Sequence, residues 1–564
     1  MRFGLVAAGV LLLSGMGLGL AEGQVVINVE ASKPVGTYQP VWSYFGADEP
    51  NYTYAPNGEK LLRELSALSS APVYFRTHNL LTTGDGSSSL KWGSTNAYRE
   101  NPDGSPIYDW TITDRIFDAL TGAHVRPLVE VGFMPEALST HPEPYRHTFP
   151  NGDVFTGWSY PPKDYEKWSA LITAWVRYLH DRYGAQVDGW LWEVWNEPDI
   201  SYWHGTPEEY DRLYDVTAAA IREVLPQAKV GGPESTGPAN DKAAAFLRQF
   251  LDHCAHGVNA ATGKTGAPLD FISFHPKGSP KFLQEGTSGH VRMNVGAQLR
   301  SVERGMQIVA SYPEWRNTPI ILGESDPEGC AACKGAQNGY RNGPLYGVSV
   351  AEATMRSYEL ARQNNVTLQG VVTWAFEFED QPYFAGFREL ATNGIDKPVL
   401  NVFRMMGMLG GDWLRVSSSG AQPLQDVVEK SVTGADDVDA VATRRNNEVD
   451  VLLWSYHDDD VPAEPAPVEL AVKGLPDVKM HGKKMHGKKM HGEIYRMDAE
   501  HSNAYAAWQK MGSPLMPTTE QLRAIATAGS LEHTPIALEG RSGGEVHLHT
   551  ALPRQGVYLV RMTW

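Results

Sequence analysis

Residues 190–198 read Trp-Leu-Trp-Glu-Val-Trp-Asn-Glu-Pro. Aromatic and β-branched side chains favour a buried strand, and the proline ends it directly after Glu197. Seven further β-rich runs flank this one along the chain: 41–45, 73–78, 127–133, 229–234, 271–276, 319–325 and 370–378. Helix-like segments separate the runs, and segment 164–183 has apolar residues at helical spacing: Trp168, Leu171, Ile172, Trp175 and Leu179. Eight strands alternating with helices predict an α/β fold, a (β/α)8 TIM barrel.

The barrel is expected to occupy residues 38–405. Beyond it the chain changes to short alternating strands between turn residues, which predicts an accessory C-terminal β-sandwich over 406–564. Residues 22–37 hold one more strand, which we expect to join the sandwich. Residues 479–492 repeat Lys-Met-His-Gly-Lys with a period of five. We interpret this repeat as a surface hairpin, although its three histidines leave metal binding as an alternative.

Composition narrows the classes of function. The chain has 564 residues with 49 Lys+Arg and 66 Asp+Glu, a net charge of −17, which argues against a nucleic-acid partner because such binding needs a basic surface. The 16 Trp, 24 Tyr and 17 Phe are suited to sugar rings, but they also fill large cores. Composition therefore favours a carbohydrate protein without establishing one.

The N-terminus resembles a secretory leader. Arg2 precedes an apolar and small-residue stretch, and Gly19-Leu20-Ala21 offers a cleavage site. We expect a signal peptide at residues 1–21, a secreted or periplasmic mature chain, and no stable membrane association after cleavage. The three cysteines are an odd number, so at least one thiol stays unpaired or pairs with another chain. Cys330 and Cys333 form either a local disulfide or two unreactive thiols in a loop, and the sequence does not decide between these.

Two glutamates carry the predicted chemistry. Glu197 closes the fourth run, and Glu324, in Leu-Gly-Glu-Ser, closes the seventh. The carboxyl ends of barrel strands meet at one mouth, and runs four and seven lie almost opposite each other around the ring. Two facing carboxylates can cleave a glycosidic bond, with retention when they stand roughly 5–5.5 Å apart and with inversion when the gap admits a water.

Other strand ends supply candidate substrate-binding residues. His78 closes the second run and His275 the sixth, and both are expected at the mouth. Trp374 in run eight can form the floor of a sugar subsite, or it can simply pack in the barrel. Glu379 and the neighbouring Glu377 follow it and are candidates for binding ring hydroxyls.

These motifs resemble clan A glycoside hydrolases, and within that clan the chain is most similar to family 39, the β-xylosidases and α-L-iduronidases. The resemblance spans nearly the whole mature chain, and its most specific part is the Asn-Glu-Pro segment that closes strand four. It implies Glu197 as general acid/base, Glu324 as nucleophile of a retaining mechanism, and Asn196 as a contact of the substrate 2-hydroxyl. His78 and His275 match the family's mouth histidines. No metal or other cofactor is implied.

Substrate choice stays open at this point. His275-Pro276-Lys277-Gly278 is closer to the iduronidase form of strand six, and Lys277 could pair with a uronic acid carboxylate, with help from Arg388. The xylosidase-like features favour a retaining exo-glycosidase, a xylan 1,4-β-xylosidase-like enzyme that releases terminal xylose from xylo-oligosaccharides. The alternatives are an α-L-iduronidase-like or arabinosyl hydrolase of the same family, and a non-catalytic carbohydrate-binding protein. The sequence leaves the oligomeric state undetermined.

Overall fold

The fold is described by a computed structural model that covers residues 23–475, 478–479, 488–541 and 543–564. The predicted leader at 1–21 and two histidines of the repeat, His481 and His486, lie outside these residues. Within them, no helix combines the length and the apolar character that crossing a membrane requires.

Eight parallel strands close into a barrel, as predicted. In ring order they are β2 (Tyr44–Gly46), β3 (Tyr74–Thr77), β6 (Arg126–Val131), β7 (Leu191–Val194), β8 (Lys229–Thr236), β9 (Phe271–His275), β12 (Ile320–Leu322) and β13 (Leu368–Trp374). Each predicted run overlaps one of these strands. Ring order equals chain order, so strands four and seven, β7 and β12, lie on opposite sides of the mouth.

Helices surround this barrel: α1 (Pro56–Ser66), α2 (Thr111–Gly122), α3 (Tyr165–Tyr183), α4 (Pro207–Val224), α5 (Asp241–His256), α6 (Val295–Ala310), α7 (Pro344–Gln363) and α8 (Pro398–Met408). Their starts follow from capping residues. Asp164 accepts the backbone N–H groups of residues 166 and 167 at the start of α3, and Thr206 forms a capping box with Glu209 at the start of α4. The predicted apolar stripe of α3 is buried against the barrel, which fixes the face that the helix presents.

The barrel interior changes from apolar to charged toward the mouth. Its lower part is one hydrophobic cluster that includes Leu128, Leu191 and Phe271. Successive side chains on a strand alternate between faces, so the residues two positions further on also point inward. On β6 and β7 these are Glu130 and Glu193, both fully buried.

The C-terminal part forms one ten-stranded sheet with β1 (Val25–Thr37) from the N-terminus. The other strands are β16 (Asp412–Ser418), β17 (Asp437–Arg445), β18 (Glu448–Tyr456), β19 (Ala466–Lys473), β22 (His491–Met497), β23 (Glu532–Ile536), β24 (Glu539–Arg541), β25 (Glu545–Leu552) and β26 (Val557–Thr563). Ile27, Leu470, Ile494 and Val560 share one hydrophobic cluster although their strands are spread across the sheet. The predicted accessory C-terminal β domain is therefore confirmed, and its strands pack around one core as a single sheet that curls back on itself.

The repeat differs from the prediction where it is described. β20 (Val478–Lys479) and β21 (Lys488–Lys489) pair in parallel, whereas the arms of a hairpin run antiparallel. The hairpin interpretation therefore does not hold for these four residues, and 480–487 lie outside the described part of the chain.

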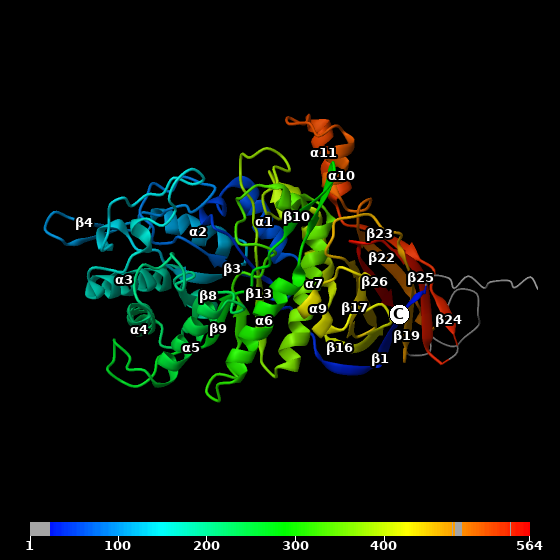
Figure 1. The fold of residues 1–564 in the computed structure, drawn as a ribbon, viewed down its shortest axis with the longest axis horizontal. Helices are drawn as coiled ribbons and strands as arrows, with labels where there is room; N and C mark the ends of the chain where they lie inside the picture. The colour runs from blue at the N-terminus through cyan, green and yellow to red at the C-terminus, as the bar shows by residue number, and fades with distance from the viewer. Residues whose placement is uncertain (1–22, 476–477, 480–487, 542) are drawn as a thin grey trace, which may run out of the picture.

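Buried and partly buried polar contacts join the β domain to the barrel. On α7, Glu352 accepts a hydrogen bond from Trp454 Nε1 at 2.6 Å. The hairpin β10 (Lys281–Glu285) and β11 (Ser288–Arg292), which follows β9, is held by Arg292 Nη2 at 2.7 Å from Asp459 Oδ2. The helices α10 (Ala504–Lys510) and α11 (Thr519–Gly529) project from the sheet (Figure 1) and share a hydrophobic cluster with Phe384, in the loop after β13. The β domain thus supports loops that follow barrel strands six and eight.

Candidate active site

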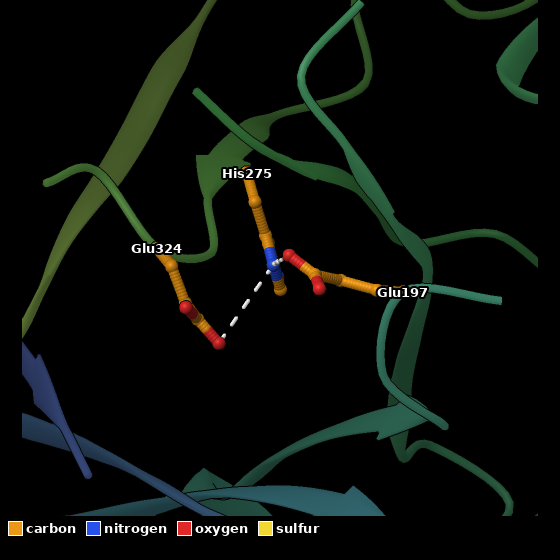
Figure 2. Close-up of side chains that lie close together, drawn as sticks. All are labelled: Glu197, His275 and Glu324. Atoms are coloured by element: carbon orange, nitrogen blue, oxygen red, sulfur yellow. Dashed lines mark hydrogen bonds and ion pairs between the residues drawn. The ribbon is translucent and has the colours of Figure 1, made fainter. Parts of the chain in front are cut away.

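The structure brings the two predicted catalytic glutamates together at the mouth. Glu197 follows β7 and Glu324 follows β12, and their side chains are 13% and 7% exposed. One carboxylate oxygen of each lies within 4.8 Å of the other, beside the buried ring of His275. Figure 2 shows both carboxylates directed toward that ring, with dashed lines marking its contacts to each.

The backbone after β7 is held in an uncommon conformation. Trp195 has φ 71° and Glu197 has φ 44°, both in the left-handed region. Such conformations cost of order 1–3 kcal/mol for residues other than glycine and concentrate at functional sites. The backbone N–H of Glu197 donates to the carbonyl of Glu234 on β8 at 2.8 Å, which fixes the turn that presents the Glu197 carboxylate.

Three positively charged groups surround Glu324. Arg76 Nη1 lies 3.1 Å from Oε1, Lys277 Nζ contacts Oε2, and His275 Nδ1 lies 3.7 Å from Oε1. Burial alone would raise the pKa of Glu324, but Lys277, His275 and Arg76 together hold that pKa well below its ordinary value. Glu324 is therefore a carboxylate at neutral pH, with its charge partly buried and directed into the mouth.

His275, the last residue of β9, bridges two glutamates. Its Nδ1 lies 2.9 Å from Glu197 Oε1 and its Nε2 lies 2.6 Å from Glu234 Oε2. Burial lowers the pKa of His275, but Glu324, Glu197 and Glu234 raise it to about 9. The ring therefore carries a positive charge at neutral pH and donates from both nitrogens.

Arg76 on β3, which was not among the residues predicted from the sequence, lies at the centre of this site. Its guanidinium is fully buried and contacts Glu193, Glu130 at 3.1 Å, Glu324 at 3.1 Å and Glu234 at 3.8 Å. A sequence signal existed, because Arg76, Glu130 and Glu193 each stand two positions after an inward-facing strand residue. That signal can be used only once it is known which alternate residues of each strand face the barrel interior.

Two predicted substrate-binding residues lie in the same cluster. Asn196 Oδ1 accepts a hydrogen bond from Arg76 Nη2 at 2.9 Å, which leaves the Asn196 amide nitrogen for another acceptor. His78 Nε2 lies 3.3 Å from Glu130 Oε2, so His78 contacts a glutamate below the mouth. Burial and the nearby Arg76 hold the pKa of His78 well below its ordinary value, so this ring is neutral.

Trp374 ends β13 and lies at the top of the barrel interior. Its ring is 2% exposed, lies 4.7 Å from the Arg76 guanidinium, and donates from Nε1 to Asp48 Oδ1 at 3.2 Å. Gly46 makes room for it, because a Cβ there would lie 2.5 Å from the indole. In this state Trp374 packs mainly against protein. Most other tryptophans are buried as well, so the aromatic excess largely fills the core.

Lys277 and Arg388, the predicted uronate ligands, have partners within the protein. Lys277 contacts Glu324 and lies 3.3 Å from Asp326 Oδ2, with 16% of its side chain exposed. Arg388 is fully buried and pairs with Glu328 and with Asp326. Of these two cations, only Lys277 therefore keeps an exposed part at the mouth.

Glu379 is bound away from this cluster. Its two carboxylate oxygens accept hydrogen bonds from the backbone and side-chain nitrogens of Asn57, at 2.8 and 2.7 Å. Both oxygens of the neighbouring Glu377 are buried without a hydrogen-bond partner among the described residues, and burial with Glu379 and Glu389 nearby raises its pKa to about 9. Of the two, Glu377 has the unused hydrogen-bonding capacity.

The loop after β12 carries a disulfide between Cys330 and Cys333. Arg341 donates to the carbonyls of both cysteines, and the backbone N–H of Arg388 donates to the carbonyl of Ala331. Of the two alternatives for these cysteines, the structure has the local disulfide, and it lies in the loop that Glu324 begins. Cys254 is buried and unpaired on α5.

Within the described part of the chain, one group has donor atoms close enough for a metal ion: Glu197, His275 and Glu324. Their atoms are already engaged by one another, by Glu234, and by the cations Arg76 and Lys277. A divalent cation would have to displace Arg76 or Lys277 from Glu324. The arrangement is better suited to proton transfer and nucleophilic attack than to metal coordination.

Comparison with known proteins gives three concordant findings. The sequence profile described as Glycosyl hydrolases family 39 matches residues 25–542. A β-xylosidase from Caldicellulosiruptor saccharolyticus is 27% identical over 78% of this chain and 80% of its own, and an α-L-iduronidase from Mus musculus is 25% identical over 97% and 82%. The crystal structure of a monomeric β-xylosidase from Caulobacter crescentus superposes with a TM-score of 0.71 at 21% identity, covering 95% of this chain and 99% of that one.

Proposed function

Because the chain belongs to glycosyl hydrolase family 39 and is a glycoside hydrolase acting on O-glycosyl bonds, we propose that it is a retaining exo-β-xylosidase that releases terminal xylose from xylo-oligosaccharides. Its two-domain architecture of a barrel with a C-terminal β domain is that of the family's solved structures.

The observation that carries the retaining mechanism is the spacing of the two glutamates. One oxygen of Glu197 and one of Glu324 lie within 4.8 Å. Retaining enzymes hold their carboxyl groups roughly 5–5.5 Å apart, whereas inverting enzymes need about 6.5–9.5 Å to admit a water. The observed gap fits direct attack on the anomeric carbon.

In the proposed first step, Glu324 attacks the anomeric carbon while Glu197 donates a proton to the glycosidic oxygen and the C–O bond breaks. The Arg76, Lys277 and His275 charges keep Glu324 ionised and ready to attack. The amide nitrogen of Asn196, which donates to no acceptor among the described residues, is available for the 2-hydroxyl of the sugar. In the second step Glu197 takes a proton from water, and the resulting hydroxide equivalent displaces Glu324 from the sugar.

One observation favours a second substrate class. The Lys277 ammonium is partly exposed beside Glu324 and could bind the carboxylate of a uronic acid sugar. An α-L-iduronidase is also among the similar proteins. Against this, Lys277 already contacts Glu324 and Asp326. We therefore keep the uronosyl hydrolase as the alternative.

A panel of nitrophenyl glycosides tests the substrate. We expect kcat/KM to be highest for the β-xyloside, compared with the α-arabinoside, the β-glucoside and the α-iduronide. Proton NMR of the first product should show the β-anomer before mutarotation. Turnover of the iduronide alone would replace xylose by iduronic acid, and an α-anomer as the first product from the β-xyloside would refute the retaining mechanism.

We also propose that the chain is exported after removal of residues 1–21. The support is the sequence pattern of the N-terminus alone. Export predicts that N-terminal sequencing of the mature protein begins near Glu22, and an intact Met1 in the cell-associated protein would contradict it.

A further inference from the structure

Glu234 is a third glutamate at the mouth, and the two-step mechanism above does not use it. It lies in β8, which pairs with β9 so that Thr236 stands beside His275. Its side chain is fully buried, and Oε2 lies 2.6 Å from His275 Nε2. Its carbonyl accepts the backbone N–H of Glu197 at 2.8 Å. Glu234 therefore contacts the backbone of Glu197 directly and its carboxylate through the imidazole.

The surrounding residues leave space for this glutamate. A Cβ at Gly323, which precedes Glu324, would lie 1.9 Å from Glu234 Oε2. Glu234 itself has φ 53°, a left-handed conformation that is uncommon for glutamate. The position of the Glu234 carboxylate thus depends on the glycine that directly follows β12 and on strained backbone in β8.

We propose that Glu234 is a positioning residue for the general acid/base. By accepting the Nε2 proton of His275, it keeps Nδ1 as a donor to Glu197 Oε1, and Glu197 Oε2 becomes the oxygen that exchanges the catalytic proton. This inference rests on the acid/base role proposed for Glu197.

The proton count supports this division between the two oxygens. A neutral imidazole has one donor nitrogen and one acceptor nitrogen. With Nε2–H directed at Glu234, a neutral His275 would present a lone pair to Glu197 and would accept the proton that the leaving group needs. A doubly protonated ring has no lone pair to offer. In the first step the proton on Oε2 goes to the glycosidic oxygen as the C–O bond breaks, and in the second step a proton of the attacking water returns to Oε2. His275 keeps both protons throughout.

The charges around His275 are consistent with a lasting positive charge. Glu197, Glu234 and Glu324 face the ring. Behind them, Arg76 lies 3.8 Å from Glu234 and also contacts Glu130 and Glu193, while Lys277 contacts Glu324. His78, the other histidine of the site, is neutral because burial and Arg76 lower its pKa. Three carboxylates therefore contact the ring directly, while the two cations contact carboxylates of the same cluster.

The variant Glu234→Gln tests the proposal, because it keeps an oxygen that can accept from Nε2–H and removes the negative charge. We expect kcat/KM for xylobiose, whose poor leaving group needs an acid, to fall by about 10²-fold. For dinitrophenyl β-xyloside, which needs no acid, kcat/KM should stay within about threefold. The basic limb of the pH profile for xylobiose should move to lower pH, since His275 loses its proton more easily.

Asp211→Asn is the matched control. Asp211 is a buried carboxylate 3.6 Å from His253 on the outer helices α4 and α5, and its loss should leave the ratio between the two substrates unchanged. An equal loss on both substrates in Glu234→Gln, or no loss on xylobiose, would overturn the proposal. Wild-type protein that hydrolyses neither xyloside would instead refute the proposed function.

A measurement on the unmodified protein keeps the proposal testable if the variant does not fold. In protein labelled with 15N-histidine, we expect both ring nitrogens of His275 to show protonated chemical shifts at pH 7, with the resonances assigned by difference from His275→Gln. A neutral ring at pH 7 would overturn the proposal.

Discussion

Lys277 offers the sharpest test of how the mouth controls its nucleophile, because one side chain serves two hypotheses. In the variant Lys277→Met, a chain of similar length and shape replaces the ammonium that contacts Glu324 and lies 3.3 Å from Asp326. The change removes one of the three positive groups around Glu324, and Arg76 and His275 remain at 3.1 and 3.7 Å.

The size of the effect follows from these distances. For the longer of the two Lys277 contacts, 3.3 Å to Asp326, a pair of unit charges interacts with about 5 kcal/mol at an effective dielectric constant of about 20, before the cost of desolvation, and the shorter contact with Glu324 is at least as strong. Net effects are smaller, because one close opposite charge typically changes a carboxyl ionisation by about 1.4–4 kcal/mol, or one to three pH units. With two cationic neighbours left, Glu324 stays ionised at pH 7. We therefore expect kcat/KM for nitrophenyl β-xyloside to change by less than about threefold at pH 7, while the acidic limb of its pH profile moves upward by about one to three pH units.

Lys277→Met should also make the folded protein less stable toward acid. The folded-state pKa of Glu324 is held below its unfolded value, so its ionised form stabilises the fold above the ordinary glutamate pKa, and this contribution is lost as pH falls toward the folded-state pKa. Without Lys277 the folded-state pKa lies closer to the unfolded value, so the ionised Glu324 stabilises the fold less at neutral pH and less stability is left to resist acid. Acid unfolding followed by circular dichroism should therefore start at a higher pH than in the wild type.

The assay is kcat/KM from pH 3 to 9, with circular dichroism at each pH to separate titration from unfolding. Lys167→Met is the matched control, since Lys167 forms an ion pair with Glu100, with 2.8 Å between Nζ and Oε1, and contacts neither Glu197 nor Glu324. An acidic limb that does not move would refute the role of Lys277 in ionising Glu324. Selective loss of nitrophenyl iduronide turnover, with the xyloside unaffected over the whole range, would show that Lys277 binds a substrate carboxylate.

Three further changes test other parts of the site. Glu324→Ala should abolish turnover, and azide should restore it with an inverted glycosyl azide as product; wild-type-like turnover without azide would remove Glu324 from the nucleophile role. Gly46→Ala should lower activity, and it should lower the free energy of unfolding by about 1–3 kcal/mol, because the new Cβ would lie 2.5 Å from the Trp374 indole. An unchanged melting temperature would mean that the indole can move aside without cost. Replacing His481, His486 and His491 by glutamine should leave xyloside hydrolysis unchanged. If hydrolysis falls in this variant, and added zinc raises the activity of the wild type but not that of the variant, the repeat has a metal-binding role.

The strand ends that carry chemistry could be read from the sequence. Glu197 and Glu324 each follow a short apolar run, and the count of eight runs places those two ends across a barrel mouth. This works because strand periodicity and turn residues are local properties. The same reasoning gave the place of His275, the last residue of its strand.

Local sequence patterns did not predict that the β domain is a single sheet, nor which residues pair with one another at the mouth. Period-two patterning identifies strands, but it does not say whether ten of them form one curled sheet or two separate ones. Lys277 was expected to face substrate, and the fold places it against Glu324 and Asp326. Glu379 was expected to bind sugar hydroxyls, and the fold gives both of its oxygens to Asn57.

The sequence by itself thus determined the barrel, the accessory β domain and the two glutamates that close opposite strands. Only the tertiary structure decided which charge meets which. Arg76, Glu130, Glu193 and Glu234 come from four different strands, and they meet because barrel closure turns one face of every strand inward. The strength of their interactions depends on burial and on distances of a few ångströms, and neither quantity is a property of the local sequence.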